Sequence, residues 1–132
     1  LGGNTDMFSV MKLTQNVENA LRQDEFAMPA RRVLEMATIE GARSMGLGDV
    51  IGSLTPGKRA DLIMVRTGDI NIAPMTDVAH LLVEAAQPAN VDTVVIDGKI
   101  AKWNGRLTKL DPEKIIRDAA QSLARIRREA NI

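Results

Sequence analysis

Cysteine and tyrosine are absent from the 132-residue sequence, which has only one histidine, one tryptophan and two phenylalanines. Without cysteine, the chain can form neither disulfides nor thiolate metal sites. Its lone histidine has no second histidine with which to share a metal ion. Because aromatic residues are so few, the stacking platforms that bind single-stranded nucleic acids are missing as well. The sequence therefore excludes several common kinds of functional site.

An excess of either charge is also missing, because 17 Lys and Arg side chains balance 17 Asp and Glu side chains. Nucleic-acid and membrane-surface binding both rely on an excess of positive charge, so we expect neither partner. The basic stretch ARIRREA near the end is explained by arginine favouring a helix C-terminus. There is no signal-like N-terminus and no long apolar run, so we expect a cytoplasmic protein.

Four segments carry apolar residues at the three-to-four-residue spacing of a helix. They are residues 6–22, 29–45, 76–86 and 111–130. Asn4, Thr5 or Asp6 could cap the first segment with a side-chain oxygen. Gly41 lowers the helix propensity of the second segment, so we expect it to allow close packing against a neighbour.

The stretch IGSLTPGKRADLIMV, residues 51–65, predicts a β-hairpin. Residues 51–54 form its first short strand in this interpretation, and Pro56-Gly57 suits the centre of a type II turn. The apolar run at 62–65 indicates a second strand that is covered on both faces. Asp61, at the entrance to that strand, is expected to bond turn N–H groups and anchor the turn.

Residues 91–107 predict further strands, with Asp97-Gly98 as a two-residue hairpin turn. All these strands together are too few to close a barrel and would leave unpaired edges and an uncovered face. The sequence also begins with Leu1 rather than methionine, which we interpret as a processed or truncated start. Partner strands are therefore expected from outside this chain.

No catalytic residue emerges from the side chains themselves. His80 lies among apolar residues, which favours a packed or capped helix histidine over a base or metal ligand. Asp61 could be catalytic, but its place beside a turn favours the structural role. The segment is therefore interpreted as framework.

The stretch MATIEGARSMGLGDVIGSLTPGKRADLIMV resembles the C-terminal region of the amidohydrolase superfamily. The resemblance is to the branch of cytosine deaminases, S-adenosylhomocysteine deaminases and triazine chlorohydrolases. It is carried by the matching family pattern at Ala37-Thr38, Gly41-Ala42, Gly46-Leu47, Ile51 to Leu54, Pro56 to Lys58 and Ala60 to Leu62. The segments TDVAHLLVEAA and VDTVVIDGKIAKWNGRL resemble the parts that follow in the family.

The resemblance implies an α+β chain that is one part of a larger enzyme. Residues 1–48 would be the last two helices of a (β/α) barrel, and residues 49–110 would be the C-terminal share of a small β-sandwich. Residues 111–132 would form a terminal helix that packs back on the barrel. The partner is then the preceding portion of the same enzyme, and a homo-oligomer is expected.

Enzymes of this family hold a zinc or iron ion with several histidines and an aspartate, and none of those histidines is present here. Asp6, in GGNTDMFSVMK, is the one candidate for the metal-binding aspartate, although the resemblance places the ligand upstream of Leu1. We therefore expect no catalytic residue and no metal ligand other than this candidate in the segment.

The resulting hypothesis is the C-terminal segment of a metal-dependent amidohydrolase that acts on C–N or C–Cl bonds of a ring-bearing small molecule. The segment alone is expected to be inactive. The alternative is a stand-alone interaction or dimerisation module that reuses the same half-domain.

If the 132 residues fold by themselves, we expect them to self-associate, because large exposed apolar patches rarely stay solvated. Sedimentation velocity over a range of concentrations measures this. A well-behaved monomer at high concentration would contradict the prediction.

Overall fold

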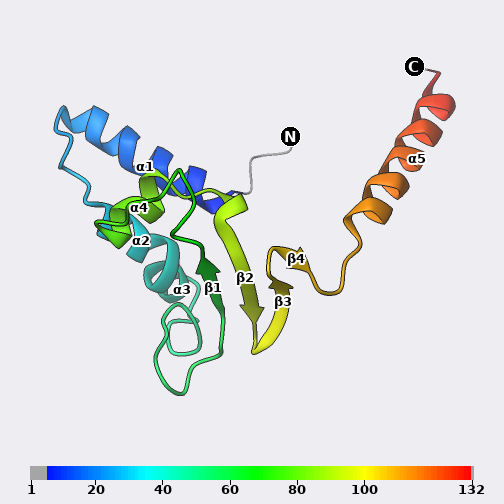
Figure 1. The fold of residues 1–132 in the computed structure, drawn as a ribbon. Coiled ribbons are helices and arrows are strands. Elements are labelled where there is room, and N and C mark those ends of the chain that lie inside the picture. The colour runs from blue at the N-terminus through cyan, green and yellow to red at the C-terminus, as the bar shows by residue number, and fades with distance from the viewer. Residues whose placement is uncertain (1–5, 132) are drawn as a thin grey trace.

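A computed structural model describes residues 6–131, and Figure 1 shows helices gathered beside a small sheet, with one helix extending away. The elements are α1 (Met7–Arg22), α2 (Ala30–Glu35), η1 (Met36–Glu40), α3 (Gly41–Ser44), β1 (Leu62–Val65), α4 (Val78–Glu84), η2 (Pro88–Asn90), β2 (Val91–Ile96), β3 (Lys99–Trp103), β4 (Arg106–Leu107) and α5 (Pro112–Ala130). All four predicted helices are therefore present, and the second is a continuous run of α2, η1 and α3. The chain combines helices with antiparallel strands, as an α+β chain does.

The strands form one antiparallel sheet in the order β1-β2-β3-β4. Leu62 pairs with Val95, so the strand predicted at 62–65 is present, but its partner is β2. The strand predicted at 51–54 is wrong, because these residues form a bent loop. The β-hairpin predicted from the local sequence is thus replaced by a pairing across about 30 residues, which no local turn specifies.

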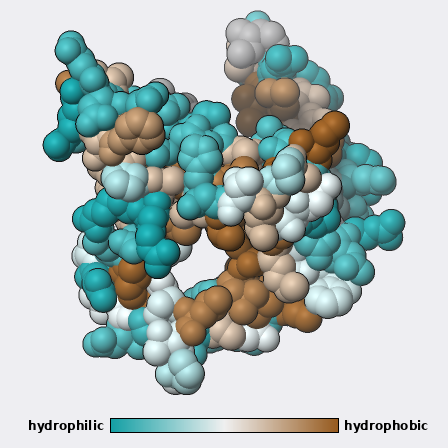
Figure 2. All heavy atoms as spheres, turned by 60° about the vertical axis from the view of Figure 1, so that its left-hand side comes forward, coloured by the Kyte–Doolittle hydropathy of each residue, from teal (hydrophilic) through white to brown (hydrophobic). Residues whose placement is uncertain are grey.

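The prediction that β1 is covered on both faces is not met by the described residues. Ile63 and Met64 are 50% and 55% exposed. Figure 2 shows hydrophobic side chains reaching the surface in several places. The most exposed of the large ones are Leu13, Leu21, Phe26, Met45, Leu54, Ile70 and Ile116. A surface with this many exposed apolar side chains indicates faces that need a partner.

The core lies where α4 contacts both α1 and α2. Its buried members are Phe8, Met11, Val33, Ile72, Val83, Ala86 and Val91. Each of the larger side chains, all but Ala86, contributes about 1.5–3 kcal/mol through removal from water. Lys12 adds a polar link, because its ammonium donates to the Glu84 carbonyl at the end of α4 at 2.8 Å. The core therefore joins residues from both sides of position 48, the boundary that the resemblance implies between the barrel helices and the sandwich.

The close approach expected at Gly41 occurs at Gly52 instead. A Cβ on Gly41 would lie 3.0 Å from the carbonyl oxygen of Met36 in the same helical run, so no neighbouring segment approaches it closely. A Cβ on Gly52 would lie 2.6 Å from the Ala42 Cβ and 3.1 Å from the Thr38 carbonyl oxygen. The loop at 51–54 thus packs directly on η1, a π-helical turn, and on the start of α3.

We expect Gly52→Ala to lower the free energy of unfolding by about 2–4 kcal/mol. The new Cβ would collide with Ala42, and the φ of +85° at Gly52 is unfavourable for alanine. Gly57→Ala is the matched control, since Gly57 has a φ of +93° but nothing within 4 Å of a Cβ. It should cost only the backbone term, about 1–2 kcal/mol. Urea unfolding of both variants measures the difference, and equal losses would contradict the close contact.

Candidate functional site

Asp6 is the N-cap of α1. Its backbone is extended, and its carboxylate accepts hydrogen bonds from the Phe8 N–H at 3.0 Å and the Ser9 hydroxyl at 2.5 Å. A carboxylate at this position satisfies N–H groups that the helix leaves unpaired. Of the three caps considered, Asn4 and Thr5 lie outside the described residues. Asp6 therefore has a clear structural role at the start of the helix.

The described residues do not fit a metal site. No group of three or more His, Cys, Asp or Glu side chains between residues 6 and 131 could hold an ion. Zinc sites in enzymes usually have three protein ligands, and Asp6 is at most one. Whether Asp6 contributes to a metal site together with other parts of a longer protein stays a prediction.

His80 lies in the first turn of α4, and its side chain is exposed. Its backbone N–H donates to the Asp77 carboxylate at 2.8 Å, which makes Asp77 the helix cap. Of the two structural roles predicted for His80, packing is wrong and a place in a capped helix turn is confirmed. No neighbouring histidine or carboxylate cluster among the described residues gives it a metal-binding role.

Asp61 bonds a turn, but a different turn from the one predicted. Its carboxylate accepts from the Asp97 N–H at 2.6 Å, and the Ala60 carbonyl accepts from the Gly98 N–H at 3.0 Å. The expected anchoring of Pro56-Gly57 is therefore wrong. Pairing of β1 with β2 brings the Asp97-Gly98 turn beside Asp61, and this neighbourhood exists only once the sheet has formed.

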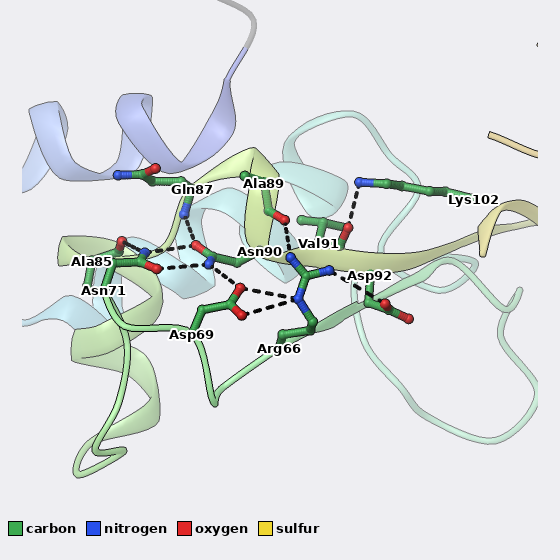
Figure 3. Close-up of polar contacts among 10 residues, drawn as sticks. All are labelled: Arg66, Asp69, Asn71, Ala85, Gln87, Ala89, Asn90, Val91, Asp92 and Lys102. Carbon is green, nitrogen blue, oxygen red and sulfur yellow. Dashed lines mark hydrogen bonds and ion pairs between the residues drawn. The ribbon is translucent and has the colours of Figure 1, made fainter. Parts of the chain in front are cut away.

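A polar cluster that sequence analysis did not identify centres on Asn90, which is 3% exposed (Figure 3). The Asn90 amide N–H groups donate to Asp69 at 2.8 Å and to the Asn71 side chain at 3.0 Å. Its carbonyl oxygen accepts from the Gln87 N–H at 2.8 Å and from Asn71 at 3.0 Å. Every hydrogen-bonding position of this buried amide is thus satisfied, so the cluster stabilises the fold.

Arg66 extends the cluster to the sheet. Its guanidinium lies 3.2 Å from the Asp69 carboxylate and 3.6 Å from that of Asp92, and it donates to the Ala89 carbonyl at 2.7 Å (Figure 3). The hydrogen bond from Asn90 and the guanidinium of Arg66 lower the pKa of Asp69, and the hydrogen bond to Asp69 raises the pKa of Arg66. An acid held ionised in this way is a weak general base, so the cluster is built for structure rather than catalysis.

A cavity of about 560 Å³ opens beside the loop that follows α3. Its lining is formed by Ile39, Arg43, Gly46, Gly48, Asp49, Ser53, Thr55 and Lys58. The Lys58 ammonium donates to the carbonyls of Gly48 and Ile51, so it ties the two ends of the loop together. The cavity contains no histidine and no nucleophile paired with a base, and it offers no catalytic arrangement.

Comparison with known proteins identifies the family of this chain. The sequence pattern of the amidohydrolase family matches residues 1–101. The chain belongs to the amidohydrolase family. The resemblance noted in the sequence is therefore confirmed, and a stand-alone module is not favoured.

Several curated relatives are named as deaminases. The chain is 32% identical to a 5-methylthioadenosine/S-adenosylhomocysteine deaminase of Syntrophomonas wolfei, over 93% of this chain and 28% of that protein. It is 36% identical to a 5'-deoxyadenosine deaminase of Methanosarcina acetivorans, over 97% of this chain and 29% of that protein. The amidohydrolase chain thus spans less than a third of the length of these relatives.

Solved structures show the same fold. An adenosine deaminase of Xanthomonas campestris with bound zinc is 35% identical, with a TM-score of 0.87 over 92% of this chain and 28% of that one. A zinc complex of the atrazine chlorohydrolase of Arthrobacter aurescens is 24% identical, with a TM-score of 0.77 over 86% of this chain and 25% of that one. The second likeness shows the fold alone.

Within residues 6–131, no helix combines the length and the apolar character that a membrane span requires.

We expect the polar cluster to make stability depend on pH below about pH 4. The lowered pKa of Asp69 means that its ionised form stabilises the native state fully above the unfolded-state pKa of about 4. This contribution is lost as the pH falls through the native pKa. The melting temperature of the wild type should therefore exceed that of Asp69→Asn at pH 7, with a smaller difference near pH 3.

The control for this prediction is Asp49→Asn, which removes a negative charge at an exposed position outside the cluster. Subtracting its effect at each pH corrects for the change in net charge. A difference between wild type and Asp69→Asn that stays constant from pH 7 to pH 3 would contradict the role of the Asp69 carboxylate.

Proposed function

We propose that this chain is the C-terminal part of a metal-dependent amidohydrolase that removes ammonia from an adenine-type nucleoside. The observation that supports this most strongly is the likeness to the zinc-bound adenosine deaminase, at 35% identity and a TM-score of 0.87. The relatives named as deaminases are 32–39% identical, against 24% for the triazine chlorohydrolase. Cleavage of a C–N bond is therefore favoured over cleavage of a C–Cl bond.

In this proposal the chain supplies framework. The helices before residue 48 would complete the end of the barrel, and residues 49–110 would supply the C-terminal share of the small sandwich. The exposed apolar residues of β1 and the outer face of α1 support this role, because both require cover from elsewhere. The whole enzyme would hold zinc or iron as its cofactor, with its ligand set outside the described residues.

The outer face of α1 is apolar, and a framework helix of this kind needs cover on that face. Phe8, Met11 and Gln15 point into the core, while Val10, Leu13 and Val17 lie on the other side and are 44%, 64% and 48% exposed. A helix with apolar residues on opposite sides is suited to lie between two packed layers. The described chain provides only one of these layers, so the proposal assigns the second to the preceding portion of the enzyme.

The test is an assay of ammonia release by the longer protein that contains this sequence. We expect zinc-dependent release from S-adenosylhomocysteine or 5'-methylthioadenosine, and no chloride release from a chlorotriazine. The isolated 132 residues with zinc should release neither, because residues 6–131 contain no group of metal ligands. Chloride release without ammonia release would contradict the substrate class, and metal-dependent hydrolysis by the isolated chain would contradict the framework role.

Asp6→Asn separates capping from metal binding in the same longer protein. Asparagine caps a helix about as well as aspartate, so a residue that acts only as a cap should tolerate the change. We expect metal content by atomic absorption and melting temperature to remain near wild type. Asp6→Ala is the comparison variant, and it should lose about 1 kcal/mol of stability with metal content retained. Loss of zinc from both variants would identify Asp6 as a ligand.

A further inference from the structure

Asn104-Gly105, the turn between β3 and β4, is the only Asn-Gly pair in the sequence. Each of the other asparagines is followed by alanine, threonine, valine or isoleucine. An asparagine side-chain amide lies within reach of the next backbone nitrogen, and a side chain on that next residue hinders their approach. Glycine has no side chain and leaves the approach open. This pair is therefore the place where the sequence is chemically most disposed to lose ammonia.

The loss of ammonia proceeds through a cyclic imide. The backbone nitrogen of Gly105 attacks the Cγ atom of Asn104, so a new C–N bond forms. The bond from Cγ to the side-chain nitrogen breaks, and that nitrogen leaves as ammonia with the proton of the Gly105 amide. Water then opens the imide at either carbonyl, which gives aspartate or isoaspartate. No oxidant, metal or enzyme takes part, so the Gly105 N–H controls whether the reaction starts.

The fold engages this N–H group. It donates to the Asp92 carbonyl on β2 at 2.9 Å. Asp92 lies between two buried residues, Val91 at 8% and Thr93 at 2% exposure, so the acceptor belongs to a fixed part of the structure. While this hydrogen bond persists, the Gly105 nitrogen is directed at the sheet and its proton is retained.

The backbone of the turn opposes ring closure as well. The φ angles of Asn104 and Gly105 are +46° and +76°, and positive values at both central residues are what a type I′ turn requires. The imide ring contains the Cα–C bond of Asn104 and holds it rigid at a different rotation. The turn must therefore change its conformation before the ring can close.

Thr108 holds the other side of the hairpin closed. β4 has only two residues, Arg106 and Leu107, and ends the described sheet (Figure 1). Directly after it, the Thr108 N–H donates to the Ala101 carbonyl at 3.0 Å, and the Thr108 hydroxyl donates to the Ile100 carbonyl at 2.8 Å. Since β4 itself is so short, these bonds to β3 contribute much of what keeps the turn formed.

We propose that Asn104 is a site of spontaneous deamidation whose rate the fold limits through the Gly105–Asp92 hydrogen bond and the Thr108 contacts. Conversion in the native protein then requires local opening of the β3–β4 hairpin. All the contacts involved lie within residues 91–108. The inference is therefore independent of the proposed reaction and of what covers the sheet in a longer protein.

Peptide mass spectrometry of the longer protein that contains this sequence measures the conversion. Trypsin releases residues 103–106, because it cleaves after Lys102 and Arg106. At mildly alkaline pH we expect conversion of Asn104 to be at least about tenfold slower in the native protein than in urea. A sample digested without incubation corrects for conversion during digestion. Equal rates in the two states would overturn the proposal, and so would an Asn104 that stays unconverted in urea.

Thr108→Val tests the role of hairpin opening, because valine keeps the shape of threonine and removes the hydroxyl. We expect conversion of Asn104 in the folded protein to become about fivefold faster, with the rate in urea unchanged. Thr108→Ser is the matched control, since it retains the hydroxyl and should convert at nearly the wild-type rate. Circular dichroism at the incubation temperature verifies that both variants are folded. If Thr108→Val converts no faster than Thr108→Ser, the proposal is overturned.

The products give a second readout. Isoaspartate adds a carbon atom to the backbone, which a two-residue turn cannot accommodate, whereas aspartate keeps the backbone unchanged and accepts a positive φ. Trp103, the only tryptophan, directly precedes the turn. We expect its fluorescence to shift in the isoaspartate fraction of aged protein and to remain near wild type in Asn104→Asp. Identical spectra for all three would overturn the dependence of the hairpin on this turn.

Discussion

The packing of α4 between α1 and α2 is the interaction on which the rest of the described chain depends. Val83 of α4 is 1% exposed and Val33 of α2 is 2% exposed, which makes them the most completely buried apolar residues of the core. This contact holds the segment after β1 close to the helices that precede the sheet. Because Val91 belongs to the same core, this packing also holds the start of β2 in place.

Polar contacts add to the apolar core by holding the two ends of the β1–β2 strand pair. The Arg66–Asp69–Asn90 cluster ties the loop after β1 to the turn before β2, and Asp61 ties the start of β1 to the end of β2. Both ends of the β1–β2 pair are therefore held by side chains as well as by the strand ladder. Such contacts stabilise the fold, because the buried Asn90 amide is fully satisfied within the chain.

The residues that carry the family resemblance serve the fold of the described chain. The residues that identify this chain are glycines, a proline-glycine turn and Asp61, and the structure shows why they are needed. Gly52 touches the helix, and Asp61 bonds a turn. None of these features involves a reacting group. The described contacts of these family residues are therefore contacts that stabilise the fold.

Sequence patterns predicted the helices well and the contacts between distant residues poorly. A helix cap such as Asp6 and the hairpin turn at Asp97-Gly98 depend on neighbours along the chain, and the sequence shows those neighbours directly. The expected strand at 51–54 failed for the opposite reason. Its residues have acceptable strand propensity, but no partner strand reaches them. They pack on the helix surface near Ala42 instead.

The sequence by itself determined the helices, the strong turns and the family, because composition and local spacing specify these features. Only the tertiary structure decided that β1 pairs with β2, that Asp61 serves the distant turn, and that Asn90 gathers Asp69 and Asn71. Each of these contacts joins residues about 20 to 40 positions apart. Their formation depends on the free energy of burying the shared core, which no local stretch of sequence expresses.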